Sequence, residues 1–325
     1  MKVASVFSSA IALLASTCYA KNIILTNDDG WASTNIRAAY NALTDAGHNV
    51  FLVAPASQRS GWGGRYELPD TTTLLTDGEF SYPPAGAPSF SYEPTNDHIW
   101  YLNGTPAACV GFALDYVIPR YFPNITIDLV VAGPNEGTNI GSGAYTYSGT
   151  IAATYNAVLR GYPGIAFSGS MTNNSFFKDS LNNDTDNPSN ILGQKVVQLA
   201  DVLFTKQGVN SRTLPLSIGL NVNFPNVGTD SSTNCTDPKY VFTRFTGSKE
   251  TSTFVTYDNA TGLLGTTSKY TAPDGNCLNG NCSLTSGTAL LASGCYASID
   301  VFSIDYDAPI GIAYETENLF AAALG

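Results

Sequence analysis

Two adjacent carboxylates, Asp28 and Asp29, follow an apolar run and precede a glycine. The run at 22–26 predicts a buried strand, and a helical pattern begins a few residues after the glycine. Like charges side by side repel each other, and the end of a strand in a sheet is partly shielded from water. A bound cation would remove that repulsion. The alternative is a solvated turn, because Asn, Asp and Gly are common turn residues.

Two further oxygen-bearing side chains follow predicted strands. The strand expected at 49–54 leads to Ser60, and the strand expected at 127–132 leads to Asn135. Because strand, helix and strand alternate at the start, we expect a parallel sheet whose loops meet at the carboxyl ends of the strands. Carboxylates, a hydroxyl and an amide carbonyl suit a hard divalent cation such as Mg²⁺, Mn²⁺ or Ca²⁺. We therefore expect one cation per subunit, bound by Asp28, Asp29, Ser60 and Asn135.

The predicted start of a helix supplies an anion site beside this cation site. Ser148 and Thr150 open an apolar pattern that ends at Leu159. Backbone N–H groups and the helix dipole at such a start attract phosphate, and the glycines within 137–143 let the backbone approach a ligand closely. Ser148 could also act only as a helix cap, and the two roles are compatible. A cation facing a phosphate cradle predicts a phosphomonoester hydrolase, in which the metal neutralises phosphoryl oxygens and activates water.

Alternating strand and helix patterns must position these loops. Helices are expected at 36–46, 104–118 and 191–204, and strands at 164–168 and 216–221. Thr105 and Pro106 mark the start of the second of these helices. This alternation predicts an α/β fold.

Two stretches depart from the alternation. Residues 62–101 are rich in Pro, Gly, Ser and Tyr, and we expect a long excursion over the active edge, with hairpins at 72–75 and 99–102. Its aromatic side chains could stack on a base as part of a lid, although packing of the loop explains them as well. After Pro225, alternating patterns predict β-hairpins closed by a strand at 297–306 that could return to the main sheet. We therefore divide the chain into 1–20, 21–225 and 226–325.

The first twenty residues predict a secretory signal peptide. Lys2 precedes an apolar segment at 3–15 that is too short to span a bilayer, and Ala20 is a small residue suited to cleavage. Sequons of the form Asn-x-Ser/Thr support a glycosylated, secreted protein. They start at Asn103, Asn124, Asn173, Asn183, Asn234, Asn259 and Asn281.

Four cysteines in the last third of the chain make an even set. In a secreted protein they predict two disulfides, with three possible pairings. We expect Cys277–Cys282 to close a short loop and Cys235–Cys295 to close a long one. Cys109 lies among apolar residues, so we expect it to be buried.

The chain of 325 residues carries a formal charge of −11. An acidic surface repels nucleic-acid phosphates, so a nucleic-acid polymer is not an expected partner. No segment after the signal reaches the length of a transmembrane helix, so no membrane partner is expected. A compact phosphorylated substrate can still bind where a metal outweighs the overall field.

Five motifs, in order along the chain, resemble those of the SurE family of survival-protein nucleotidases and phosphatases. They are Asn27-Asp28-Asp29-Gly30, Val53-Ala54-Pro55 running to Arg59-Ser60-Gly61, Gly104-Thr105-Pro106 with Cys109-Val110, Gly133-x-Asn135-x-Gly137-x-Asn139-x-Gly141, and Tyr147-Ser148-Gly149-Thr150. The resemblance covers 22–168 and, less clearly, continues to 223. It implies a Rossmann-like three-layer α/β/α domain and a divalent-metal-dependent phosphatase that hydrolyses nucleoside monophosphates.

The resemblance also implies roles for single residues. Carried over by position, the metal ligands are Asp28, Asp29, Ser60 and Asn135. The phosphate ligands are Asn139, Ser148, Gly149 and Thr150. The two aspartates are the expected catalytic residues, and Asp28 would position or activate the attacking group.

The chain also departs from the family pattern. Residues 33–35 replace the usual Ala-Pro-Gly turn, and the cysteine-rich C-terminal third differs from that of compact bacterial members, whose C-terminal arm makes dimers. Together with the signal and the sequons, this indicates a secreted eukaryotic branch of fungal type, related to acid phosphatases, and it leaves a homodimer open. The alternative function is a non-catalytic secreted module that binds a metal or a glycan on the same fold. An esterase with Ser60 or Ser148 as nucleophile would lack a Gly-x-Ser-x-Gly elbow.

Overall fold

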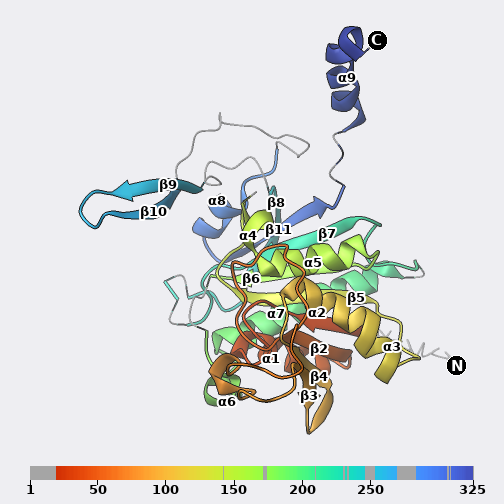
Figure 1. Ribbon diagram of the computed structural model, residues 1–325, viewed down its shortest axis with the longest axis vertical. Coiled ribbons are helices and arrows are strands. Elements are labelled where there is room, and N and C mark those ends of the chain that lie inside the picture. Colours follow the sequence, from red (N-terminus) through yellow and green to blue (C-terminus); the bar gives the residue numbers. More distant parts are fainter. Residues whose placement is uncertain are drawn as a thin grey trace, which may run out of the picture.

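A nine-stranded sheet runs through the body of the protein (Figure 1). The computed structural model describes residues 20–324 except for positions 142, 171–173, 209, 230, 233, 246–252, 269–282, 306 and 308. The strand order is β3-β4-β2-β1-β5-β6-β7-β11-β8. The strands are β1 Asn22–Thr26, β2 Asn49–Pro55, β3 Phe90–Glu93, β4 Asn96–Leu102, β5 Leu129–Glu136, β6 Gly164–Gly169, β7 Ile218–Asn223, β8 Lys239–Thr243 and β11 Tyr296–Ser303.

Most neighbouring strands of this sheet are parallel. The run from β4 through β2, β1, β5 and β6 to β7 is parallel throughout. At the two edges, β3 pairs antiparallel with β4, and β11 pairs antiparallel with β7 but parallel with β8. Because the central strands run the same way, their carboxyl ends meet at one edge, and the loops that follow them lie together there.

Helices cover both faces of the sheet. Helix α1 (Thr34–Asp45) packs against α7 (Pro188–Gln207), and α2 (Pro106–Phe112) packs against α5 (Gly149–Leu159) (Figure 1). Successive side chains of a strand point to opposite faces. Ile23 and Leu25 of β1 accordingly join the core that includes α1 and α7, whereas Ile24 joins the core that includes α2 and α5. The expected three-layer α/β/α fold is confirmed.

The C-terminal part of the chain contributes two strands, β8 and β11, to the same sheet. A disulfide joins Cys235 to Cys295, which directly precedes β11, and confirms the expected long-loop pairing. The expected pair Cys277–Cys282 lies outside the described residues, as do positions 1–19 of the signal peptide expected at 1–20. The hairpin of β9 (Thr253–Asp258) and β10 (Leu263–Ser268) and the helix α9 (Ile310–Leu324) project from the body (Figure 1).

Three local expectations need correction. The excursion expected at 62–101 ends in the main sheet: the segment at 99–102 forms a hairpin, as expected, because β4 pairs antiparallel with β3, but β4 also pairs in parallel with β2. Residues 72–75 form only an isolated bridge between Thr73 and Pro88. The helix expected at 104–118 is α2 followed by a wider turn at 113–117 and by α3 (Ile118–Tyr121).

The remaining short helices are α4 (Ala144–Tyr147), α6 (Phe177–Ser180) and α8 (Gly287–Ala292). Thr105 precedes α2 but does not cap it through its side chain, because its hydroxyl accepts a hydrogen bond from the Glu67 backbone N–H at 3.0 Å. Cys109 is buried, as expected, and forms no disulfide with another cysteine of the described residues. Among the described helices, none combines the length and the apolar character needed to cross a membrane.

Candidate active site

Asp28 lies just beyond β1, against the first turn of α5. Its Oδ1 accepts a hydrogen bond from the Thr150 hydroxyl at 2.7 Å, and its Oδ2 accepts one from the Thr150 backbone N–H at 3.2 Å. A Cβ at position 149 would lie 2.7 Å from the Asp28 Cβ, so Gly149 is what allows this approach. The carboxylate therefore occupies the positive end of the α5 dipole, where negative charge is stabilised.

Asp29 is held by β5 and by the turn that follows β1. Its Oδ2 accepts a hydrogen bond from the Glu136 backbone N–H at 2.9 Å. Asn27 shapes the turn, since its side-chain nitrogen donates to the Gly30 carbonyl at 3.0 Å and to the Ser33 hydroxyl at 3.1 Å. Gly30 adopts φ of +100°, which favours glycine. Ser33, where the chain departs from the family pattern, thus supports the turn that presents the two aspartates.

Asn135 carries a buried oxygen that has no hydrogen-bond partner among the described residues. The side-chain nitrogen of Asn135 donates to the carbonyls of Glu136 at 3.1 Å and Gly137 at 2.7 Å, and these bonds fix the direction of the amide. Its Oδ1 is therefore the unpaired atom. Leaving a buried acceptor unpaired costs about 1–3 kcal/mol. Such an oxygen is well suited to bind a cation.

The loop after β2 brings Ser60 to the same edge of the sheet. The backbone N–H of Arg59 donates to the Asp28 carbonyl at 2.6 Å, and the backbone N–H of Gly63 donates to the Tyr147 carbonyl at 3.1 Å. These bonds tie the loop to the turn after β1 and to the segment before α5. Ser60 is exposed on this loop. The three loops predicted to meet therefore do so, with Ser60 on the open side.

Carboxylates crowd this edge more than the sequence indicated. Burial raises the pKa of Asp28 above its usual value. Burial, and then the charge of Asp28, raise the pKa of Asp29 well above its usual value, with smaller contributions from the charges of Glu136 and Glu79. Burial, together with the charges of Glu79 and Asp28, raises the pKa of Glu136 to about 7. A divalent cation placed among these groups would favour their ionised forms.

The residues expected at the start of α5 are partly engaged by the protein itself. The Ser148 Oγ accepts a hydrogen bond from the Ile151 backbone N–H at 3.1 Å, so Ser148 caps the helix, and its hydroxyl hydrogen can still donate to a ligand. Thr150 directs both its hydroxyl and its backbone N–H at Asp28. The structure thus uses Thr150 to hold a carboxylate, and it packs Gly149 directly on that carboxylate.

Side chains of β7 hydrogen-bond both the backbone N–H and the backbone carbonyl of Asn139. Its N–H donates to the Asn223 Oδ1 at 2.7 Å, and its carbonyl accepts from the side chains of Asn221 at 2.9 Å and Asn223 at 3.3 Å. Its own side-chain nitrogen donates to the Ser168 hydroxyl at 2.8 Å. Sequence reasoning missed Asn221 and Asn223. Two asparagines spaced by two along a strand point to one face, and that spacing is the signal that could have found them.

Two further residues reach the edge from segments without a regular pattern. Glu79 is placed by its backbone N–H, which donates to the Ala56 carbonyl at 2.9 Å, and its carboxylate accepts from the Gln58 N–H at 3.1 Å. Asn174 donates to the Asp29 carbonyl at 3.2 Å, and its Oδ1 is buried without a partner among the described residues. No local pattern marks either residue, because the path of an irregular loop places it.

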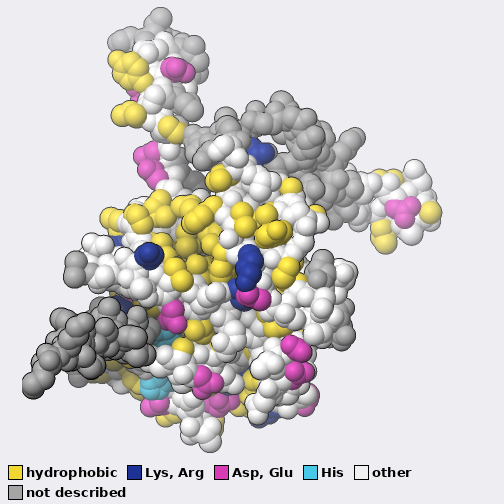
Figure 2. Space-filling view, turned by 180° about the vertical axis from the view of Figure 1, so that it is seen from behind, with side chains coloured by type: hydrophobic (Ala, Val, Ile, Leu, Met, Phe, Trp, Pro, Cys, Tyr) yellow, Lys and Arg dark blue, Asp and Glu magenta, His cyan; other side chains and the backbone are white. Residues whose placement is uncertain are grey.

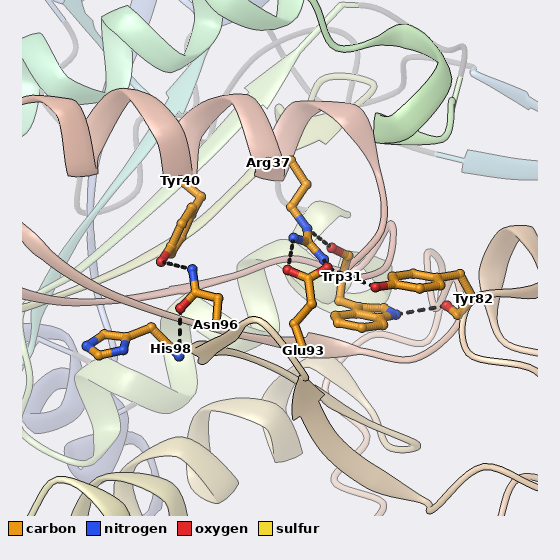
Figure 3. A network of polar contacts seen from close by, with 7 residues as sticks. All are labelled: Trp31, Arg37, Tyr40, Tyr82, Glu93, Asn96 and His98. Carbon is orange, nitrogen blue, oxygen red and sulfur yellow. Dashed lines mark hydrogen bonds and ion pairs between the residues drawn. The ribbon is translucent and has the colours of Figure 1, made fainter.

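A largely buried ion pair between Arg37 and Glu93 also contacts Tyr82, which follows Glu79 by three residues (Figure 3). Arg37 of α1 points to Glu93 of β3, with nitrogen–oxygen distances of 3.0 and 3.2 Å, and its Nε donates to the Trp31 carbonyl at 2.7 Å. The Tyr82 hydroxyl donates to Glu93 at 2.9 Å, and the Tyr82 ring stacks on Trp31 with ring centroids 4.7 Å apart. The Tyr82 ring therefore packs into the protein, as the packing interpretation expects, whereas Tyr66, Phe90 and Tyr92 of the same stretch are exposed.

The residues at this edge fit a divalent cation. No group of three or more His, Cys, Asp or Glu side chains with metal-binding geometry occurs in the described part of the chain. A cation here would therefore need neutral oxygen ligands besides the carboxylates of Asp28 and Asp29, and the unpaired Oδ1 of Asn135 is one. Burial raises the pKa of both aspartates, and a positive charge beside them would favour their ionised forms.

Comparisons with known proteins identify the family of this chain. The family model described as "Survival protein SurE" matches residues 23–250. An acid phosphatase of Yarrowia lipolytica is 44% identical over 299 residues, which span 91% of this chain and 83% of that protein. The 5′-nucleotidase SurE of Lawsonia intracellularis is 39% identical over 151 residues, which span 45% of this chain and 50% of that protein.

A solved structure shares the fold of this chain. The SurE protein of Aquifex aeolicus aligns with a TM-score of 0.60 and 22% identity, over 92% of this chain and 99% of that chain. At this level of identity the match supports the fold alone. The family match and the two relatives confirm the resemblance drawn from the five motifs, including its link to a fungal acid phosphatase.

Proposed function

The chain belongs to the SurE family, and we propose that it is a phosphomonoester hydrolase that depends on one divalent cation per subunit. The observation that carries this proposal is the buried Oδ1 of Asn135, which has no partner among the described residues and belongs to the residue before Glu136, whose backbone N–H donates to Asp29. Two buried carboxylates whose pKa values are raised become stable as anions when a positive charge lies between them. Mg²⁺, Mn²⁺ and Ca²⁺ take oxygen ligands of these kinds.

The residues at the edge divide the work of such a reaction. Asp28, Asp29, Asn135 and Ser60 would hold the cation, which supplies charge neutralisation of the phosphoryl oxygens and a more acidic water. Asp28 would orient the attacking water, because Thr150 fixes both of its carboxylate oxygens and prevents the group from rotating.

The phosphate would lie beside this carboxylate pair, next to Ser148 at the start of α5. Ser148 would donate its hydroxyl hydrogen to a phosphoryl oxygen while its Oγ keeps the helix cap. Asn139 would add a contact from the neighbouring loop, and Gly149 and Thr150 would bring the positive helix end close to the phosphate. Because these groups are already fixed by hydrogen bonds, little reorganisation would accompany the transition state.

We propose nucleoside monophosphates as the substrate class. The proposal rests on the printed names of the relatives, which include an acid phosphatase and 5′-nucleotidases. The match to the bacterial nucleotidases spans about half of their length, so it supports the type of reaction more than the identity of the nucleoside.

We also propose that the protein is secreted and glycosylated. The apolar N-terminal segment and the Cys235–Cys295 disulfide support export to an oxidising compartment. Asn124 is exposed, whereas Asn103 is half-buried and its Oδ1 accepts a hydrogen bond from Arg59 at 3.1 Å. Mass spectrometry of the protein from a eukaryotic host should find a glycan at Asn124 and none at Asn103. A fully occupied Asn103 would contradict the structure at this position.

A homodimer is the oligomeric state we propose. Helix α9 projects from the body and exposes Ile310 and Tyr314, which are 87% and 65% exposed. Figure 2 shows hydrophobic side chains gathered in a band across the body near the base of this projection. Burying such surface against a second copy would be favourable. Light scattering after size-exclusion chromatography tests the proposal, and a monomer at micromolar concentration would contradict it.

The hydrolase proposal is tested by phosphate release from a panel of phosphomonoesters, with each divalent cation and with a chelator. Asp28→Asn and Asp29→Asn should lose release, because each removes one carboxylate and keeps the shape of the side chain. Asp70→Asn, which changes an exposed carboxylate, is the control and should keep it. Release that survives the chelator or both variants would overturn the mechanism. Cation binding without turnover of any ester would favour a binding module instead.

A further inference from the structure

A buried polar cluster lies on the neighbouring strands β7, β11 and β8 (strands in Figure 1), and β7 carries the asparagines that contact Asn139. Asp300 of β11 lies opposite Asn221 of β7 on one side and opposite Thr243 of β8 on the other. Asp300 and Asn221 are both 0% exposed. The Thr243 hydroxyl donates to the Asp300 Oδ1 at 2.5 Å, and the Asn221 side-chain nitrogen lies 3.4 Å from the Asp300 Oδ2.

The amide of Asn221 links this carboxylate to the candidate active site. The same nitrogen donates to the Asn139 carbonyl at 2.9 Å, so its two hydrogens can serve Asp300 and Asn139 together. Asn139 in turn gives its backbone N–H to Asn223 and its side-chain nitrogen to Ser168. The contacts therefore run from the C-terminal strand β11, through one amide of β7, to the backbone of the loop.

Burying a carboxylate at this position is energetically unfavourable. Burial disfavours its ionised form, and no ion pair among the described residues includes Asp300. A threonine or valine would fill a strand position at lower cost. An ionised carboxylate accepts hydrogen bonds but donates none. It therefore distinguishes the nitrogen from the oxygen of the neighbouring Asn221 amide, which could otherwise flip.

The orientation of the Asn221 amide decides whether the loop is held or repelled. With the nitrogen facing Asp300, it also faces the Asn139 carbonyl and donates to it. If the amide turned by half a rotation, its oxygen would face both the Asp300 carboxylate and the Asn139 carbonyl, and both contacts would be repulsive. An acceptor at Asp300 therefore favours the orientation that holds Asn139.

We propose that Asp300 is a positioning residue, which orients the Asn221 amide and thereby fixes the loop at Asn139 for phosphate binding. This role rests on the proposed function, since it assigns Asn139 to the phosphate. In this role the C-terminal part of the chain helps to position Asn139 at the active edge. The cystine at Cys235–Cys295 joins the start of β11 to the segment before β8 and so anchors the strand that carries Asp300.

The first test is hydrogen–deuterium exchange of the full chain, read in peptides that cover 137–141. Asp300→Leu removes the acceptor and roughly keeps the size of the side chain. Asp300→Asn keeps an acceptor, because its oxygen can face Asn221 while its nitrogen donates to the Thr243 hydroxyl. We expect Asp300→Leu to speed exchange in this segment about tenfold, which is the effect of losing one hydrogen bond. Asp300→Asn should exchange within about twofold of wild type.

Peptides that cover β1 report the integrity of the rest of the sheet and should not change. If Asp300→Leu does not fold, Asp300→Ser replaces it, because its side chain is too short to reach Asn221. Equal exchange of 137–141 in wild type and in the variant that lacks the acceptor would overturn the proposal. Faster exchange in Asp300→Asn to the same extent as in Asp300→Leu would also overturn it, because the effect would then come from charge or packing.

The second test separates this role from a general structural one. With Mn²⁺ present, Asp300→Leu should raise KM and the inhibition constant for inorganic phosphate about tenfold and change kcat less, while Asp300→Asn restores both constants. A loss confined to kcat would contradict positioning of the phosphate loop. If wild type neither hydrolyses phosphomonoesters nor binds phosphate, the proposed function fails, and the exchange experiment still decides whether Asp300 orders the loop.

Discussion

Replacing Asp300 with asparagine should stabilise the protein at neutral pH. Burial raises the pKa of Asp300 from an ordinary value of 3.8 to about 6. As the pH rises through this window, the unfolded chain releases its proton before the folded protein does. Wild type therefore loses stability between about pH 4 and about pH 6, and the loss is complete above the folded pKa. Asparagine has no proton to release, so the variant avoids the loss.

The size of this effect follows from the change in pKa. A difference of about 2 units, at about 1.4 kcal/mol per unit, corresponds to about 3 kcal/mol when the loss is complete. Part of the loss is already present at about pH 4. Between about pH 4 and about pH 7.5, the unfolding free energy of Asp300→Asn relative to wild type should therefore rise by about 2–3 kcal/mol.

Urea unfolding followed by tryptophan fluorescence measures this difference, with a chelator present and the disulfide oxidised. Comparing the two proteins at each pH cancels the other titrating groups, since both proteins carry them. Asp70→Asn is the matched control, because it makes the same substitution at an exposed position. A flat difference for Asp300→Asn would refute the conclusion that an ionisable group is buried here without a positive partner.

Two other substitutions test how the edge is built. Gly149→Ala would place a Cβ 2.7 Å from the Asp28 Cβ, so phosphate release in a steady-state assay should fall about a hundredfold. Gly64→Ala, at a position with open space around it, is the control and should have no effect. Equal activity of the two variants would contradict the tight packing of Asp28. Glu93→Leu would leave the Arg37 charge buried without Glu93 as its partner, so the unfolding free energy measured in urea should fall by about 3 kcal/mol or more. A fall below about 1 kcal/mol, which is typical of an exposed ion pair, would contradict the burial of this pair.

Local patterns predicted the features that depend on neighbours along the chain. The apolar run before Asp28 forms β1, and Ser148 caps α5 because a hydroxyl before a helix has a backbone N–H within reach. The three loops meet because parallel strands end at one edge, which the alternation of strands and helices already required. The even cysteine set allowed three pairings, and the structure contains the Cys235–Cys295 bridge of the expected one.

Features that depend on distant parts of the chain could not be predicted in this way. Strand β4 begins with Asn96, Asp97 and His98, whose polar side chains hide the strand pattern, and only its pairing with β2 places it in the main sheet. The contact between Asn221 and Asp300 joins residues 79 positions apart, and it exists because β11 inserts between β7 and β8. The hydrogen bond from the Thr150 hydroxyl to Asp28 likewise depends on how closely α5 approaches β1.

The central claim is that the carboxylate pair and Asn135 hold one divalent cation that the reaction needs. Equilibrium binding of Mn²⁺, followed by electron paramagnetic resonance, tests this claim most directly when wild type is compared with Asp29→Asn. We expect one Mn²⁺ per chain in wild type, no saturable binding in the variant, and phosphate release that rises with occupancy of the site. Undiminished Mn²⁺ binding by Asp29→Asn, or full release of phosphate from wild type without bound metal, would contradict the account.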